Sequence, residues 1–286
     1  MPKLTYTNER GQSIVLGDSA PLLVTKMDGI GGVQNTIYRH KTPSQDGTTA
    51  TGSTLGEREL TIEGVILATD QAVYRQKLLQ TFNPKLTGIL QYKKGLVVKE
   101  IGCRAELAPA FPSDFSKNYQ IFLITLLCPN PFWQDIEQIK AEIALWVGDF
   151  SFPLEMIEVG AEMGHREPSL IVNTFNPGDV ECGMRVELKA LATLTNPSIL
   201  NVDTQEYLKI NKTMEAGEVI TVTTRFGAKK VENKLNGVTT NAFNYIDLGS
   251  TFLQLDVGDN LFRYNADTNI DNLEVSIYYT PQYLGV

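Results

Sequence analysis

The chain has 286 residues, of which 42% are hydrophobic, 20% charged and 9% aromatic, and its formal net charge is −8. This is the composition of a soluble globular protein, and at roughly 150 residues per domain the length predicts two domains that each bury a core. The longest apolar run, at residues 121–128, is too short for a membrane span, so no membrane insertion is expected. The first residues lack the pattern of a signal peptide, which predicts a protein made and kept in a cytoplasm.

Charge is distributed unevenly between the two halves. Residues 1–130 carry 14 Lys/Arg against 11 Asp/Glu, whereas the remainder carries 11 against 22. Such asymmetry indicates different surroundings for two domains. An acidic chain without basic runs repels phosphate, so no specific nucleic-acid partner is expected. Three cysteines, an odd number at wide spacing, exclude a disulfide scaffold and a CxxC metal site.

The first half is predicted to consist mainly of strands, with one protruding arm. Short apolar runs at residues 14–16 and 22–24, and the alternating residues 60–66, are typical of half-buried strands. Between them, Lys41–Gly56 is rich in Thr, Ser, Gly and Gln and offers almost nothing to bury. Its flanks, residues 33–40 and 55–66, predict a hairpin arm whose tip cannot pack on its own domain. A polar loop of this length is usually functional or ordered by a partner.

One helix is expected after the arm. Asp70 can cap its first turn, and Tyr74, Leu78 and Phe82 recur on one face. Asn83–Pro84 ends the helix because proline has no amide to donate. Strands are predicted to resume at residues 88–92, 96–106 and 119–128, and Pro129–Asn130–Pro131 then marks a domain boundary.

The second half is predicted to be a β-sandwich or jelly roll. Residues 136–146 fit both a helical stripe and an alternating strand, and the stripe favours a short helix. From Phe152 onward, turn signals such as Asn236–Gly237 separate short stretches rich in β-branched residues. The predicted domains are residues 1–132 and 133–286.

Recognisable catalytic motifs are missing from the sequence. Only two histidines exist, His40 and His165, and both are interpreted as surface or partner-contact residues. Asp28–Gly32 lacks the helix and Lys of a phosphate loop. Asp267–Asp271 begins like a calcium loop, but Asn272 and Tyr278 stand where glycine and glutamate belong. No residue is predicted to be catalytic, cofactor-binding or metal-binding, no cofactor is expected, and the chain is predicted not to be an enzyme.

Two alternatives remain open beside a purely structural role. A glycosidase would need a carboxylate pair, for which Glu155 with Glu158 or Glu57 with Glu59 are the candidates. A carbohydrate-binding module recognising host cell-wall polymers would need exposed rings in the second domain or near it. The candidate rings are Trp133, Trp146, Tyr278, Tyr279 and Tyr283.

An ordered set of short motifs resembles the distal tail protein (Dit) family of long-tailed, siphovirus-type bacteriophages. In the first half these are residues 5–16 (TYTNERGQSIVL), 45–47 (QDG) with Arg58, 82–85 (FNPK) with Gly88, and 128–133 (CPNPFW). In the second half they are residues 152–155 (FPLE), 176–180 (NPGDV), Gly217–Glu218 and 258–260 (GDN). They run along nearly the whole chain in the family's order.

The resemblance implies a mainly β fold and a structural role at the tail tip. Residues 1–132 would be the ring-forming domain that joins the tail tube, with one helix and a long hairpin arm. Residues 133–286 would be a galectin-like or carbohydrate-module-like β-sandwich. The implied partners are five further copies in a hexameric hub ring, the major tail tube protein, a tail-associated or tail-fibre hub protein and receptor-binding proteins. The implied location is the virion tail tip, after synthesis in the host cytoplasm, with a part in host adsorption.

Overall fold

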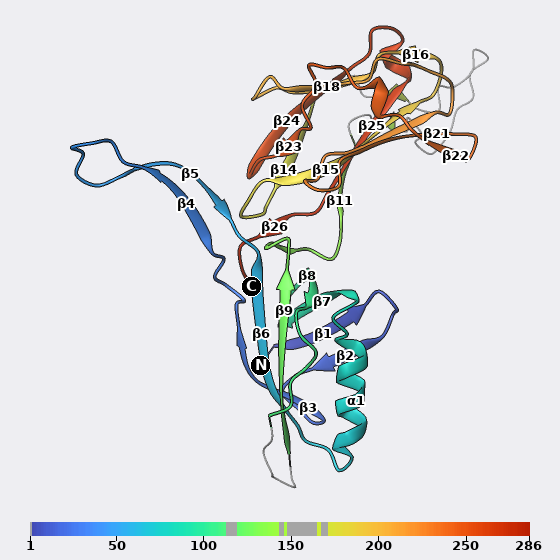
Figure 1. Cartoon of the computed structure of the whole chain (residues 1–286). Coiled ribbons are helices and arrows are strands. Elements are labelled where there is room, and N and C mark those ends of the chain that lie inside the picture. Colours follow the sequence, from blue (N-terminus) through green and yellow to red (C-terminus); the bar gives the residue numbers. More distant parts are fainter. Residues whose placement is uncertain (1, 113–118, 143–145, 148–164, 167–170) are drawn as a thin grey trace. The chain divides into compact units, whose positions relative to one another are not determined.

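The computed structural model describes residues 2–112, 119–142, 146–147, 165–166 and 171–286. The contacts divide the chain into two compact units (Figure 1): unit 1 comprises Met1–Ile136 with Gln282–Val286, and unit 2 comprises Glu137–Pro281. The division lies four residues after the predicted position of 132/133, and the last five residues belong to unit 1. The reason is packing: Trp133 is fully buried in the core of unit 1, and strand β10 (Trp133–Gln134) pairs with β26 (Gln282–Tyr283).

Unit 1 is built on one antiparallel sheet with the strand order β2-β1-β7-β8-β9-β6-β3. A bridge from Gly17 to Leu23 brings the two outer strands together, with the Val24 amide donating to the Gly17 carbonyl at 2.7 Å. The sheet therefore curls toward a barrel, and alternate residues of each strand point into its core. The strands are β1 (Lys3–Asn8), β2 (Ser13–Leu16), β3 (Leu22–Asp28), β6 (Arg58–Ile66), β7 (Thr87–Lys94), β8 (Val97–Ala105) and β9 (Gln120–Cys128).

The predicted helix is confirmed as α1 (Gln71–Thr81), capped by the Asp70 carboxylate, which accepts from the Val73 amide at 3.4 Å. Leu78 and Phe82 are fully buried. The Phe82 ring stacks on Tyr6 of β1, with ring centroids 4.3 Å apart. This one buried stripe holds the helix against the sheet.

Unit 2 is a β-sandwich, as the turn spacing predicts. One sheet has the order β11-β25-β15-β20-β21-β22 and the other β14-β24-β17-β18, and the apolar side chains of both form one core. The first sheet consists of β11 (Ile139–Glu142), β25 (Leu273–Tyr279), β15 (Cys182–Ala190), β20 (Val219–Thr223), β21 (Lys230–Leu235) and β22 (Val238–Asn241). The second consists of β14 (Ile171–Asn176), β24 (Gly258–Asn265), β17 (Ser198–Asn201) and β18 (Tyr207–Lys209).

Short elements complete unit 2. They are β12 (Trp146–Val147) paired with β13 (His165–Arg166), β16 (Leu194–Thr195) paired with β19 (Thr213–Met214), β23 (Gln254–Leu255), and the 3-10 turns η1 (Phe243–Tyr245) and η2 (Ile270–Asn272). The Asn236–Gly237 hairpin between β21 and β22 is confirmed, with both residues at positive φ.

The predicted short helix at residues 136–146 is wrong. Residues Ile139–Glu142 form β11, which pairs with β25 from Ile139 opposite Tyr279 to Glu142 opposite Ser276. The alternating pattern prevails over the helical stripe because β25 offers an open edge whose backbone groups need partners. Residues 143–145 lie outside the described part of the chain.

A buried carboxylate gives unit 2 a pH-sensitive contact. Glu218 is fully buried and accepts hydrogen bonds from the Lys212 ammonium and, at 2.8 Å, from the Glu215 amide. Burial opposes ionisation, but these bonds outweigh it and lower the pKa of Glu218 below its ordinary 4.5. A lowered pKa stabilises the fold above the unfolded-state pKa, and this contribution is lost as the pH falls through the folded-state pKa.

We therefore expect acidification below about pH 4.5 to lower the melting temperature of unit 2 through Glu218. Glu218→Gln should lower the melting temperature of unit 2 by roughly 4–8 °C at pH 7. In this variant the melting temperature should also depend less on pH below about pH 4.5. Thermal unfolding followed by circular dichroism from pH 3 to pH 8 measures both effects. Glu215→Gln, in the same turn but exposed, is the matched control, and an equal effect of the two substitutions would contradict the assignment.

Candidate functional site: an arm and its anchor

The predicted arm exists as a two-stranded hairpin of β4 (Asn35–His40) and β5 (Thr49–Leu55), projecting from unit 1 (Figure 1). Its returning strand β5 lies within the stretch predicted to be the polar tip, and residues 58–66 of the predicted flank form β6 of the main sheet instead. Every residue of both strands is exposed. Three of them are large apolar side chains, Ile37, Tyr38 and Leu55. An isolated hairpin is at best marginally stable in water, so an arm with this composition gains stability when another surface covers it.

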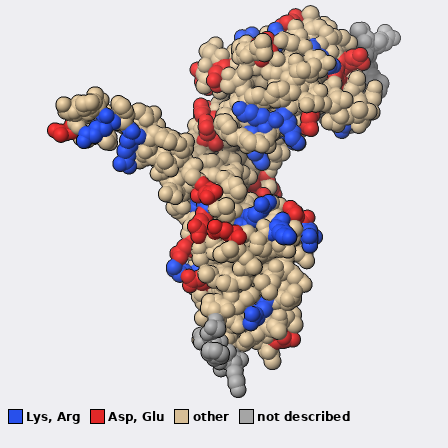
Figure 2. Space-filling model, in the orientation of Figure 1, with Lys and Arg blue, Asp and Glu red and all other residues tan. Residues whose placement is uncertain are grey.

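The arm and its foot carry opposite charges. Arg39, His40 and Lys41 lie together at the outer end of β4, with Asp46 as the only acid of the arm. Figure 2 shows this basic stretch on the arm and acidic side chains near its foot. The foot carries the exposed carboxylates of Asp28, Glu57 and Glu59, of which Asp28 is paired with the Lys26 ammonium. We call Asp28, Glu57 and Glu59 the acidic foot.

A buried arginine anchors the base of the arm. Arg58, the first residue of β6, is only 1% exposed. Its Nε donates to the Pro131 carbonyl at 2.7 Å, and its Nη1 and Nη2 donate to the carbonyls of Gly29 and Leu284 at 2.5 Å each. Burial lowers the pKa of Arg58, but a guanidinium stays protonated, so three carbonyl dipoles replace the water that it loses.

This anchor joins three segments that are far apart in sequence: the loop after β3, the segment before β10, and the end of the chain. Trp133 reinforces it, because its Nε1 donates to the Ile30 carbonyl at 3.1 Å. Gly29 has φ +86°, and a Cβ there would clash with the Glu59 carbonyl. The glycine-rich Asp28–Gly32 loop therefore presents carbonyls to Arg58 and Trp133, which is a structural use of the loop.

The end of the chain has a second attachment. The Lys99 ammonium binds Asp135 at 2.6 Å and lies 3.3 Å from the centre of the Tyr283 ring. The Tyr283 hydroxyl donates to the other oxygen of Asp135 at 2.9 Å. Burial, with the Asp135 carboxylate, raises the pKa of Tyr283.

The other sequence candidates do not gather into one site. His40 is exposed at the end of β4, and Glu57 and Glu59 are exposed on either side of Arg58. His165 lies in β13, and its side chain is outside the described part of the structure, as are Glu155 and Glu158. In the calcium-like loop, Asp267 accepts from Asn196 and from Lys209. The described residues contain no cluster of three or more His, Cys, Asp or Glu that could hold a metal ion.

The aromatic candidates are mostly occupied by contacts within the chain. Trp133 is fully buried, and Tyr279 is 4% exposed with its hydroxyl donating to the Phe175 carbonyl. The Tyr278 ring has the Arg185 guanidinium 4.3 Å and the Lys140 ammonium 5.6 Å from its centre. The Trp146 side chain is outside the described part of the structure. Tyr278 therefore meets cations where a sugar would have to stack.

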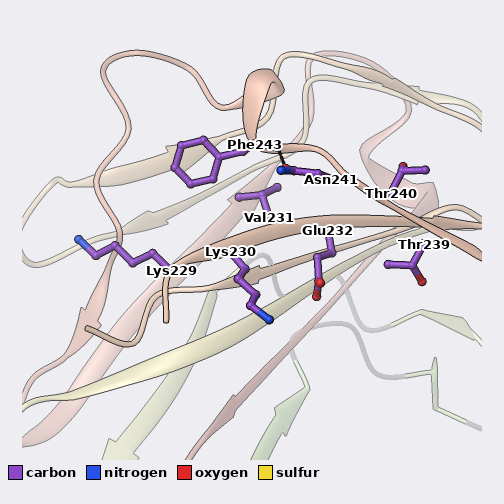
Figure 3. Close-up of a pocket in the computed structure, with 8 residues that line it drawn as sticks. All are labelled: Lys229, Lys230, Val231, Glu232, Thr239, Thr240, Asn241 and Phe243. Atoms are coloured by element: carbon purple, nitrogen blue, oxygen red, sulfur yellow. Dashed lines mark hydrogen bonds between the residues drawn. The ribbon is translucent and has the colours of Figure 1, made fainter. Parts of the chain in front are cut away.

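Two shallow hollows lie against β21 and β22. Figure 3 shows the smaller, of about 310 Å³, where Lys230, Glu232 and Phe243 line the wall. The larger, of about 630 Å³, lies over the outer face of the same sheet. On that face Lys189 pairs with Glu274 at 2.8 Å and Arg185 lies 3.7 Å from Glu187, and such exposed pairs are typical of a solvated face. In the described part of the chain, no helix has the length and hydrophobicity of a membrane span.

Sequence analysis names Arg58 only as part of a family motif, and it predicts neither the anchoring role of this residue nor the return of the chain's end to unit 1. A signal for Arg58 was present, because the alternation of buried Leu60 and Ile62 continues backward to residue 58. The return of Gln282–Val286 to unit 1 has no local signal, because it depends on pairing with a strand about 150 residues away.

Comparison with known proteins agrees with the fold. The model for the phage tail protein RIFT-related domain matches residues 9–128, and the model for the siphovirus-type tail component, C-terminal domain, matches residues 177–283. The crystal structure of SPP1 Dit (gp 19.1), described as a paradigm of hub adsorption apparatus in Gram-positive infecting phages, superposes with a TM-score of 0.69, 13% identity and 98% coverage of both chains.

A chain of the phage P2 baseplate in its activated conformation with Ca superposes with a TM-score of 0.54, 10% identity and full coverage of both chains. No curated protein matches the chain in sequence. The two family models cover unit 1 and unit 2 in the expected order, and the SPP1 Dit fold spans both. The chain therefore belongs to the distal tail protein (Dit) family and is a structural component of the siphovirus-type phage tail.

Proposed function

We propose that this protein is the hub of the tail tip: six copies form a ring that joins the major tail tube protein to the tail-associated or tail-fibre hub protein and to receptor-binding proteins. The observation that carries the proposal is the arm, which exposes every residue of β4 and β5 yet is held at its base by a buried arginine. A rigid foot with an uncovered hairpin is suited to reach a neighbouring copy.

A closed ring requires heterologous contacts, in which one surface of a copy meets a different surface of the next. The arm and the acidic foot are two such surfaces on one chain. The cations Arg39 and Lys41 of one copy have their complement in Glu57 and Glu59 of the next, and the exposed Ile37 and Tyr38 supply apolar area. Complementary charge fixes the register of such a contact more than it adds affinity.

The proposed role uses shape and contact and no catalysis. The role is also consistent with the lack of clustered Lys and Arg in the chain. Such clusters would bind DNA phosphates by releasing counterions, and DNA must pass through the tail without being bound. Saccharide binding is not advanced as a second function. Among the candidate rings whose side chains the structure describes, Trp133 and Tyr279 are buried, and Tyr278 and Tyr283 have cations close to their rings.

Purified full-length protein should form a closed ring with a central opening at high protein concentration. Light scattering should give a mass near six times the 31.7 kDa chain, and negative-stain images should show the symmetry. Deletion of residues 35–55, replaced by a short Gly-Ser linker, should leave a folded monomer. A strictly monomeric full-length protein, both alone and mixed with its tail tube protein, would refute the ring.

A further inference from the structure

Cys103 and Cys128 lie opposite each other on neighbouring strands. In the β8–β9 ladder Arg104 pairs with Leu127 and Ala105 with Leu126, and one further step in the same register brings Cys103 to Cys128. The Glu106 amide donates to the Thr125 carbonyl, and hydrogen-bonded pairs alternate with non-hydrogen-bonded pairs along an antiparallel ladder. The cysteines thus occupy a non-hydrogen-bonded position, where Cα atoms are about 4.5 Å apart, within the range that a disulfide spans.

Both cysteines are free in the structure and belong to the core of unit 1. Cys103 is 4% exposed and Cys128 is fully buried. The Cys128 thiol is within hydrogen-bonding reach of Cys103, and this contact together with burial raises the pKa of Cys103 well above its ordinary value. The third cysteine, Cys182, is buried in unit 2. The pair therefore arises from the fold, although the spacing in sequence gave no reason to expect it.

We propose that Cys103 and Cys128 form a disulfide when the protein passes into an oxidising medium. Each thiol loses one hydrogen, the two sulfurs join, and the two electrons and two protons reduce a low-molecular-weight disulfide to two thiols. A virion component leaves the reducing interior of its host for such a medium. The Cys103–Cys128 disulfide, which we call the staple, is absent during synthesis and present outside the cell.

The staple lies beside the arm's anchor. Across the sheet, Gly88 of β7 pairs with Cys103, and Cys128 pairs with Arg58 of β6. The β8–β9 ladder is short, with two register pairs. Few backbone hydrogen bonds therefore join these two strands, and a covalent link between them would stabilise the sheet at this point. Closing the loop between residues 103 and 128 restricts the unfolded chain and fixes the strand that faces Arg58.

The test is oxidation of the full-length protein with oxidised glutathione, followed by alkylation of the remaining thiols in denaturant, peptide mass mapping and thermal unfolding. We expect alkylated cysteines to fall from three to one, with a peptide pair linking Cys103 to Cys128 and Cys182 still alkylated. The melting temperature of unit 1 should rise by about 5–10 °C and return on reduction.

Matched variants separate this bond from other oxidation. Cys182→Ser should keep both the link and the thermal shift, whereas Cys103→Ser and Cys128→Ser should lose both. Because burial slows access of the oxidant, the wild-type chain is also refolded from denaturant in an oxidising glutathione buffer, where every thiol starts exposed. No Cys103–Cys128 link after refolding, or a link that leaves the melting temperature unchanged or lower, would overturn the proposal.

Discussion

Arg58→Ala is expected to lower the free energy of unfolding of unit 1 by about 3–5 kcal/mol. The substitution removes all three guanidinium bonds: it leaves the Pro131 carbonyl buried without its donor, and the carbonyls of Gly29 and Leu284, which are partly buried, lose theirs. The Pro131 carbonyl contributes most to the loss, because a buried acceptor has no water to replace its donor. Urea unfolding followed by the fluorescence of Trp133, which donates to the neighbouring Ile30 carbonyl, measures the loss. A Trp146→Phe background removes the other tryptophan.

Two further substitutions make the experiment specific. Arg58→Lys keeps the charge, but its single ammonium cannot reach three carbonyls in different directions, so most of the loss should remain. Arg10→Ala removes an exposed arginine of the same unit and should change stability little. If Arg58→Ala unfolds at the same urea concentration as Arg10→Ala, the anchor contributes nothing and its proposed role at the arm is refuted.

Reversing the charge of the arm is expected to weaken ring formation by about tenfold or more per interface. In Arg39→Glu with Lys41→Glu, two attractions to the acidic foot become repulsions, and the effect recurs at every interface of a closed ring. The concentration at which the ring dissociates, from sedimentation or mass photometry, measures the change. Raised salt should weaken the wild-type ring and strengthen the variant, because screening acts on attraction and repulsion alike.

The decisive control is compensation. The double substitution Glu57→Lys with Glu59→Lys, made by itself, should disrupt the ring. Combined in the same chain with Arg39→Glu and Lys41→Glu, it should restore ring formation. Lys93→Glu with Lys94→Glu changes the net charge equally at exposed positions of the same unit, and it should leave assembly unchanged. Rings that tolerate the reversed arm, or a combined variant that stays dissociated, would show that the acidic foot is not where the arm binds.

Much of the local structure of this protein could be predicted from its sequence, because it depends on residues close together in the chain. Asp70 and the stripe through Leu78 and Phe82 determine α1, and Asn236–Gly237 determines a hairpin. The arm was predictable for the opposite reason: Lys41–Gly56 has nothing to bury. The incorrect helix at residues 136–146 shows the limit of such local prediction. Its apolar residues fit both the helical and the strand periodicity, and pairing with the open edge of β25 makes residues 139–142 a strand.

What the sequence by itself determined is thus the order and type of most elements and the family resemblance carried by their motifs. The tertiary structure alone decided which distant residues meet. Arg58 donates to the carbonyls of residues 29, 131 and 284, and Cys103 contacts Cys128 on the neighbouring strand. The physical reason is that the partners of a buried polar group or thiol depend on the register of the strands and on where distant segments of the chain return to the core. Both are set by the packing of the whole core.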